Sequence, residues 1–252
     1  MGKIQTDLTA ISRKLIEIQD EIREYFDWDM SEDVESATRM LSRVEKSDLE
    51  SWKRQNRLAT LSKLHDSLVI MKPEVVVLGA AVEPEEISIA LKRPALFVSA
   101  DGAAGAISEL QSSEKEMAWS RVICSVSDAD GGEGTLEAVR RAIPIILHAH
   151  GHNQEDWKKL LNFAESVQEP PELVLTHQTM PEIPGMHNPG GFTDGDRAIC
   201  FLMSLGLDRN QISLLGTRTD LVGRWSGNTS EPRKMKKLRW MERVLLLNGI
   251  EI

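Results

Sequence analysis

Six short apolar runs constrain what this chain can fold into. They are rich in β-branched residues, most are separated by segments with helical spacing, and they lie at 75–78, 96–98, 122–126, 143–147, 173–175 and 212–215. Continuous apolar runs predict strands that are covered on both faces, and alternation with helices predicts parallel neighbours joined by crossovers. We therefore predict an α/β fold, a three-layer sandwich around a mostly parallel sheet.

The beginning of the chain follows a different pattern. It is almost free of glycine and proline and places apolar residues three or four positions apart, as at Leu61 and Leu64, which indicates amphipathic helices. We predict a helical N-terminal section over 1–72 and an α/β catalytic domain over 73–252. The sequence leaves open whether the helices form a homodimer interface, close over a site or only cover the sheet.

Three aromatic residues of this section, Phe26, Trp28 and Trp52, could form a surface on which a nucleotide stacks. Aromatic residues at helical spacing more often belong to the core or to an interface. We expect this second role.

The composition restricts the partners of the chain. Its 252 residues carry a formal net charge of −9, which argues against duplex nucleic acid because phosphate binding usually needs a basic surface. Both cysteines lie among apolar residues, and the sequence contains neither a membrane-length apolar stretch nor a signal-peptide core. We expect a cytoplasmic protein with no membrane partner. We interpret the acylation-like pattern at 1–6 and the N-T-S at Asn228 as coincidences.

Small, polar or ionisable residues follow every predicted strand. Because the carboxyl ends of parallel strands share one edge of the sheet, these segments should converge on one crevice. The segments are G-A-A-V-E-P from Gly79, A-D-G-A-A-G from Ala100, S-D-A-D-G-G from Ser127, H-A-H-G-H-N from His148, T-H-Q-T from Thr176 and G-T-R-T-D from Gly216. One such loop is common on any fold, but several with paired carboxylates and imidazoles predict a functional site.

Asp128 and Asp130 are the main metal candidates. In a locally extended chain their carboxylates face the same way, and the glycines that follow allow a sharp turn. Mg²⁺ takes one or two carboxylates and completes its shell with water and substrate phosphate oxygens. A D-x-D pair alone also occurs in ordinary surface turns.

Asp101 and Gly102 open a loop of small residues that continues into a helix. Small residues allow a phosphate or a ring to approach the backbone, and the first amides of the helix favour an anion. Asp101 is also a favoured helix N-cap, and the two roles are compatible. The sequence contains neither a Walker loop nor a G-x-G-x-x-G loop.

The segment G-G-F-T-D-G-D-R-A, which starts at Gly190 and Gly191, precedes another helix. Capping explains one acid there but not two acids and an arginine after a twin glycine. We predict that Asp194 binds metal or the amidine edge of a heterocycle, and that Asp196 is a third metal ligand. Arg197 would pair with a phosphate or hold one of the acids.

His148, His150 and His152 alternate after the fourth predicted strand. An H-x-H pair at a strand end also begins the zinc sites of amidohydrolase barrels, with His177 and His187 as further candidates. Too few residues follow for such a barrel, which needs roughly 250 residues in all. A zinc hydrolase is therefore a weaker interpretation than a magnesium–phosphate enzyme.

Five motifs occur in a fixed order along the chain: A-D-G-A at 100–103, S-D-A-D-G at 127–131, H-A-H-G-x-N at 148–153, T-x-Q-T at 176–179 and G-G-F-T-D-G-D-R-A at 190–198. In this order they resemble the archaeal 6-hydroxymethyl-7,8-dihydropterin pyrophosphokinases, whose catalytic region is similar to that of thiamin pyrophosphokinases. The resemblance runs from about residue 73 to the C-terminus, and the helical section in front is also similar.

The resemblance implies transfer of a diphosphate group from ATP to the hydroxymethyl oxygen of the pterin, with release of AMP. It implies Mg²⁺ held by Asp128 and Asp130, with Asp101 matching the acid of the A-D-G motif. The chain departs from the family at three places: His152 replaces a usual aspartate, Gly132 stands where an acid is common, and G-A-A-V-E-P from Gly79 replaces G-x-G-P-S on the nucleotide side.

The remaining roles follow from this chemistry. We predict that His150 or a nearby carboxylate takes the proton of the attacking alcohol, with His148 orienting, and that Asp101 and Arg197 also act in catalysis. Lys236, in a basic C-terminal cluster that is mostly a solvated helix face, is predicted to reach the triphosphate. The neutral groups predicted to read the pterin edge are those of Asn153, Thr176 and Gln178.

Two alternatives stay open. D-x-D often holds the diphosphate of a nucleotide sugar, so a metal-dependent glycosyltransferase on the same scaffold is one alternative. The other is a catalytically silent sensor of nucleotides or pterins.

Overall fold

Six strands form one sheet in the computed structural model, which describes residues 7–227 and 230–252. The strands are β1 (Val75–Leu78), β2 (Leu96–Ala100), β3 (Val122–Ser127), β4 (Ile145–Ala149), β5 (Leu173–His177) and β6 (Ile212–Leu215). They lie in the order β5-β4-β3-β2-β1-β6, and all neighbours are parallel. The predicted α/β class is confirmed. The patterns at 1–6 and at Asn228 lie outside the described residues.

All six predicted strands are present, with differences at their ends. The strand predicted at 143–147 begins two residues later, because Ile143 N donates to Ala138 O at the end of α7 (Gly132–Arg140) and Pro144 has no N–H group for the sheet. This strand and β5 extend further than predicted at their carboxyl ends. As a result, His148 and His177 are strand residues rather than loop residues.

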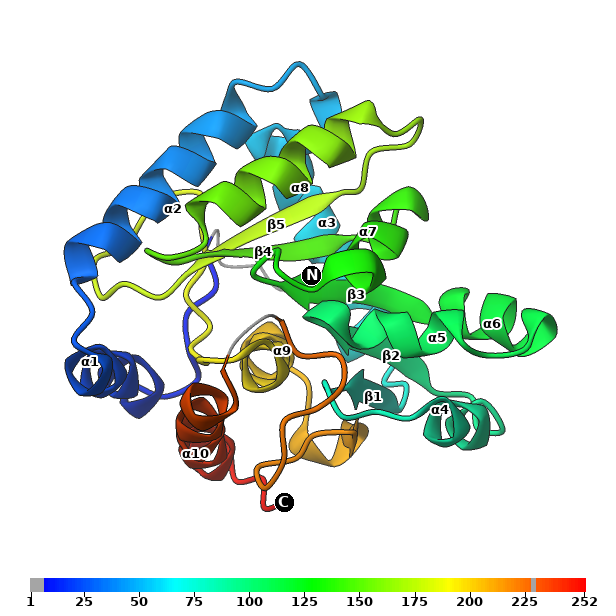
Figure 1. Cartoon of the computed structure of the whole chain (residues 1–252). Coiled ribbons are helices and arrows are strands. Elements are labelled where there is room, and N and C mark those ends of the chain that lie inside the picture. Colours follow the sequence, from blue (N-terminus) through cyan, green and yellow to red (C-terminus); the bar gives the residue numbers. More distant parts are fainter. Residues whose placement is uncertain (1–6, 228–229) are drawn as a thin grey trace.

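Helices cover both faces of the sheet (Figure 1). One face packs against α2 (Met30–Glu45), α4 (Pro84–Ala90), α5 (Gly105–Ser108), α6 (Ser112–Trp119), α7 and α8 (Gln154–Ser166), and the other against α3 (Arg54–His65), α9 (Asp194–Leu205) and α10 (Glu231–Leu247). Alternate strand residues enter the two cores: Val76 and Leu78 belong to the first, and Val75 and Val77 to the second. The predicted three-layer sandwich is confirmed.

The N-terminal section is helical, as predicted, and consists mainly of α1 (Lys14–Phe26), α2 and α3. Met40 of α2 and Leu61 of α3 enter the two opposite cores of the sheet. Trp52 is fully buried and its Nε1 donates to Pro171 O at 2.9 Å, so this aromatic residue belongs to the core. The division into two domains at residue 72 stays a prediction.

The two cysteines, Cys124 and Cys200, are buried and free. Burial raises the pKa of the Cys124 thiol to about 12, so this residue packs as an apolar side chain. Among the described residues, no helix combines the length and the apolar composition needed to cross a bilayer.

Two buried histidines near the end of β5 predict a loss of stability in acid. Nδ1 of His177 accepts from Thr179 N, and Nδ1 of His187 accepts from Leu8 N at 2.9 Å. Burial lowers the pKa of each imidazole to about 4. Unfolded imidazoles, with a pKa near 6.5, take up protons in the window between these values that the folded protein does not bind. The free energy of unfolding therefore falls as the pH drops through this window, by up to roughly 3 kcal/mol per histidine.

The double substitution His177→Asn and His187→Asn is expected to flatten this dependence. Asparagine Oδ1 can accept the same backbone N–H groups without titrating. Urea unfolding near pH 7 and near pH 4.5 measures the free energy of unfolding of the variant and the wild type. Subtracting one pH dependence from the other removes the contribution of the acidic residues that both proteins contain. An equally steep loss of stability in the variant would contradict the assignment.

Candidate active site

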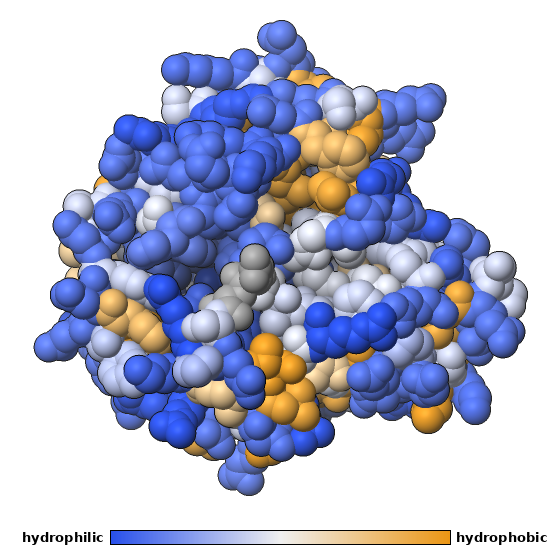
Figure 2. Space-filling model, viewed as in Figure 1, coloured by the Kyte–Doolittle hydropathy of each residue, from blue (hydrophilic) through white to orange (hydrophobic). Residues whose placement is uncertain are grey.

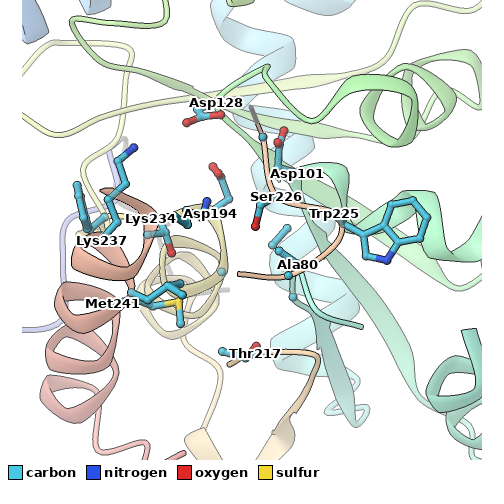
Figure 3. A pocket seen from close by; sticks show the side chains of 18 of the residues that line it. Ala80, Asp101, Asp128, Asp194, Thr217, Trp225, Ser226, Lys234, Lys237 and Met241 are labelled. Atoms are coloured by element: carbon cyan, nitrogen blue, oxygen red, sulfur yellow. The ribbon is translucent and has the colours of Figure 1, made fainter. Parts of the chain in front are cut away.

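The loops that follow the six strands line one pocket, which α10 closes with Lys234 and Lys237 (Figure 3). Among the lining residues, Gly79 follows β1, Asp101 follows β2, Asp128 follows β3, His150 follows β4, Gln178 follows β5 and Thr217 follows β6. The predicted convergence on one crevice is therefore confirmed. The pocket holds about 970 Å³ of empty space, part of it open to solvent, and Figure 2 shows a hollow on this face.

Three carboxylates meet in this pocket. Oxygens of Asp101, Asp128 and Asp130 all lie within 4.8 Å of one another. Asp101 has a φ of 47°, a left-handed conformation that residues other than glycine rarely adopt, and its carboxylate accepts hydrogen bonds from Ser127 Oγ and Thr135 Oγ1. Oδ1 of Asp128 is buried and has no hydrogen-bond partner. An unpaired carboxylate oxygen within a group of acids is what a divalent cation would bind.

Burial and mutual repulsion set the charge of these acids. Burial, followed by the charges of Asp194 and Asp128, raises the pKa of Asp101 well above its usual value. Burial and the charge of Asp128 raise the pKa of Asp194 to about 8. Burial also disfavours the charged form of Asp128, but the hydrogen bond and charge of His150 and the charges of Arg197 and Lys237 outweigh it, so the pKa of Asp128 is lowered. A bound cation would favour the ionised forms of all these acids.

The start of α9 separates the roles of its two acids. Asp194 lines the pocket and pairs with Arg197 Nη1 at 2.8 Å. Asp196 instead completes a capping box with Thr193, and its oxygens accept from Phe192 N at 2.6 Å and Thr193 N at 2.8 Å. Asp196 lies outside the group of three acids. We therefore assign it to the helix cap in place of the predicted metal role.

The segment from His148 to Asn153, at the end of β4 and in the loop after it, contributes one residue to the lining of the pocket, and its other residues support that one. Nε2 of His150 lies 3.3 Å from Asp128 Oδ2. His148 is buried, with Nδ1 at 3.0 Å from Thr176 Oγ1 and Nε2 at 3.2 Å from Gln178 Oε1. Burial and the charge of Arg197 lower the pKa of His148 well below its usual value, which keeps this imidazole neutral. Asn153 Oδ1 accepts from His150 N and so fixes the turn.

Several predicted site residues do not line the pocket. In the described part of the chain, the predicted residues outside the lining are Gly102, His148, Asn153, Thr176, Gly190, Gly191, Asp196, Arg197 and Lys236. Lys236 is exposed, whereas Lys234 and Lys237 face the acids from the other side of α10. A Cβ on Gly191 would lie 2.5 Å from Arg197 Cα, so this glycine is needed for close packing on α9.

The lining residues that the sequence interpretation did not assign to the site include Trp28, Lys234, Lys237 and Ser226. Helical periodicity offered a signal for the lysines, because Lys234, Lys237, Leu238 and Met241 share one face of α10. Ser226 lies in a loop without a motif, and its Oγ is buried without a partner, as is Thr217 Oγ1.

A parallel sheet whose strand-end loops bring carboxylates into one pocket, opposite lysines of α10, defines an α/β enzyme with a site suited to a divalent cation and a phosphorylated ligand. No family model matches the chain. The chain is similar to proteins named 6-hydroxymethyl-7,8-dihydropterin pyrophosphokinase from three archaea. For Methanothermobacter thermautotrophicus the identity is 33% over 165 residues, covering 62% of this chain and 64% of the relative.

The other two relatives are covered more fully. Identity to the Pyrococcus furiosus protein is 32%, covering 70% of this chain and 72% of the relative. Identity to the Methanocaldococcus jannaschii protein is 34%, covering 72% of this chain and 69% of the relative. The chain therefore belongs to the 6-hydroxymethyl-7,8-dihydropterin pyrophosphokinase family, as the motifs predict.

Proposed function

We propose that this chain transfers a diphosphate group from ATP to the hydroxymethyl oxygen of 6-hydroxymethyl-7,8-dihydropterin in the presence of Mg²⁺. The observation that carries the proposal is the meeting of Asp101, Asp128 and Asp130 in one pocket with Lys234 and Lys237, in a chain of this family. The acids suit a metal ion, and the lysines suit the phosphate oxygens that the metal does not reach.

The donor set fits Mg²⁺. Asp101, Asp128 and Asp130 offer only oxygen ligands. Oδ1 of Asp128 has no hydrogen-bond partner, so no hydrogen bond would have to break for it to bind a metal ion. When bound, Mg²⁺ would neutralise charge on the phosphates and polarise the reacting phosphorus. Arg197 holds Asp194 beside this group, so its proposed role is to position that acid.

The reaction asks for little covalent work from the protein. The hydroxymethyl oxygen forms a bond to the β-phosphorus of ATP, and the bond from that phosphorus to the bridging oxygen of the α-phosphate breaks, so that AMP leaves. Lys234 and Lys237 would stabilise the charge that develops on the transferred group. The hydroxyl proton would pass to the imidazole of His150, whose Nε2 lies 3.3 Å from Asp128 Oδ2.

The strand order supports separate sites for the two substrates, one on each side of the acids. β2 and β3, which carry the three carboxylates, lie in the middle of the sheet, with β1 and β6 on one side and β4 and β5 on the other. The order reverses at β1 and β6, which is where open α/β sheets bind nucleotides. We assign the nucleoside to the small residues Gly79, Ala80 and Gly216 on that side, and the pterin to the side of His150 and Gln178.

A product assay tests the function. Incubation with ATP, Mg²⁺ and 6-hydroxymethyl-7,8-dihydropterin should yield AMP and the pterin diphosphate in equal amounts, resolved by chromatography and ³¹P NMR. Formation of ADP or inorganic phosphate alone would overturn the proposed reaction. The names of the relatives give no support to the glycosyltransferase alternative. A parallel reaction in which CMP- or UDP-sugars replace ATP tests that alternative.

A further inference from the structure

Trp28 lies in the short link between α1 and α2 and lines the pocket, although it precedes all six strands in the sequence. Other tryptophans have structural roles: Trp52 and Trp157 are fully buried, and their Nε1 atoms donate to Pro171 O and Ser36 Oγ. Trp225 also lines the pocket, but its Nε1 donates to Val82 O. Trp28 is only partly buried, so part of a large ring surface is available to a ligand.

Both sides of this link are tied to the loops after β4 and β5. Before the link, Arg23 Nη1 donates to Gln178 O at 2.7 Å. After it, Asp33 accepts from Gly151 N at 2.7 Å and from Gln178 Nε2 at 2.9 Å. These contacts are buried or partly buried, so Trp28 is held in a fixed position against the His150 side of the pocket before any ligand arrives.

The surroundings of Trp28 are those of a stacking site. Its ring stacks on Phe26 at 4.7 Å with an interplanar angle of 17°, and Phe192, which also lines the pocket, lies 6.1 Å away. Lys237 Nζ lies 5.8 Å from the ring centroid. The aromatic surface therefore adjoins the cation that faces the acids.

The geometry of the reaction indicates which substrate binds against the Trp28 ring. In-line displacement places the attacking oxygen and the leaving oxygen on opposite sides of the transferred phosphorus. Figure 3 shows Lys237 on one side of the cavity and Ala80, Asp101 and Trp225 on the other, with Asp128 between the two sides. If AMP leaves on the side of Ala80, the acceptor approaches from the side of Lys237 and Trp28.

We propose that Trp28 is the stacking face for the pterin ring, so that the N-terminal helical section completes the acceptor site. This inference rests on the proposed function for the identity of the acceptor. It explains why an aromatic residue that the sequence favours as core or interface lines the pocket.

The test compares Trp28→Leu with Trp240→Leu. Trp240 packs on Tyr25 in the adjoining aromatic cluster but does not line the pocket, so it controls for a loss of packing. Dissociation constants are measured by calorimetry for the dihydropterin, with Mg²⁺ and the non-reacting analogue α,β-methylene-ATP, and for the analogue alone. Trp28→Leu should weaken pterin binding about ten- to a hundredfold, leave the analogue unchanged, and be largely rescued by Trp28→Phe.

Other outcomes overturn the inference. They are weaker binding of the ATP analogue in place of the pterin, unchanged pterin affinity, or an equal loss in Trp28→Leu and Trp240→Leu. The ratio of the dissociation constants of the variant and the wild type is measured without turnover. If wild type binds the pterin but forms no AMP, the proposed reaction fails while the role of Trp28 is still decided; if AMP forms and Trp28→Leu binds normally, only the stacking face is wrong.

Discussion

Asp128→Asn is expected to abolish diphosphate transfer while the protein stays folded. The substitution keeps the shape of the side chain but removes the charge of the acid whose Oδ1 is unpaired at the centre of the pocket. Metal stabilisation of a transition state is worth several kcal/mol, and a loss of about 4 kcal/mol corresponds to a rate roughly a thousandfold lower. AMP formation under saturating ATP and pterin measures the loss.

Stability separates this effect from misfolding. The Asp128→Asn variant would weaken the contact with His150, but it would also be relieved of the repulsion that helps to raise the pKa of Asp101 and Asp194. Because the two effects oppose each other, we expect the free energy of unfolding to change by no more than about 1 kcal/mol. In wild type, Mg²⁺ with α,β-methylene-ATP should raise the Tm, and this shift should shrink in the variant.

Asp156→Asn is the matched control. Asp156 lies in the first turn of α8, pairs only loosely with Lys159 at 3.7 Å and does not line the pocket. It should keep wild-type turnover. An active Asp128→Asn protein with an unchanged Mg²⁺ dependence would remove Asp128 from the metal site.

The sequence predicts the sheet and its acidic edge better than the rest of the site. The strands could be predicted because burial on both faces leaves continuous apolar runs, and the edge where Asp101 and Asp128 meet follows from parallel strands alone. The start of β4 could not be predicted from apolar character, because Ile143 is apolar yet closes the end of α7.

The contribution of the helical section is the part that the sequence does not reveal. Trp28 reaches the pocket, and Asp33 reaches Gly151 and Gln178 beside it, only because α1 and α2 pack near the ends of β4 and β5. Helix spacing specifies which face of a helix is buried but not which element covers it. The pair formed by Asp33 and Gln178 joins residues 145 positions apart. No local pattern marks such a contact.

Asp33→Ala is expected to have the largest effect on stability. The Asp33 and Arg23 side chains are each 6% exposed, and Nη1 of Arg23 lies 3.2 Å from Asp33 Oδ2. Removing one partner of a buried ion pair typically costs about 3–5 kcal/mol, and Arg23 would then have the partly exposed Asp20 as its charged partner. The substitution also leaves Gly151 N and Gln178 Nε2 without their acceptor. Turnover should fall as well, because both groups belong to the acceptor side of the pocket.

Asp20→Ala provides the comparison, because Asp20 pairs with the same arginine but is 41% exposed. Exposed pairs contribute about 1 kcal/mol or less, so urea unfolding should separate the two variants clearly. Where Asp33→Ala is too unstable to purify, Asp33→Asn keeps one acceptor oxygen and should recover part of the stability. If Asp33→Ala unfolded at the wild-type urea concentration, the carbonyl of Gln178 and the carboxylate of Asp20 would suffice for Arg23, and the link that carries Trp28 would be held by packing rather than by charge.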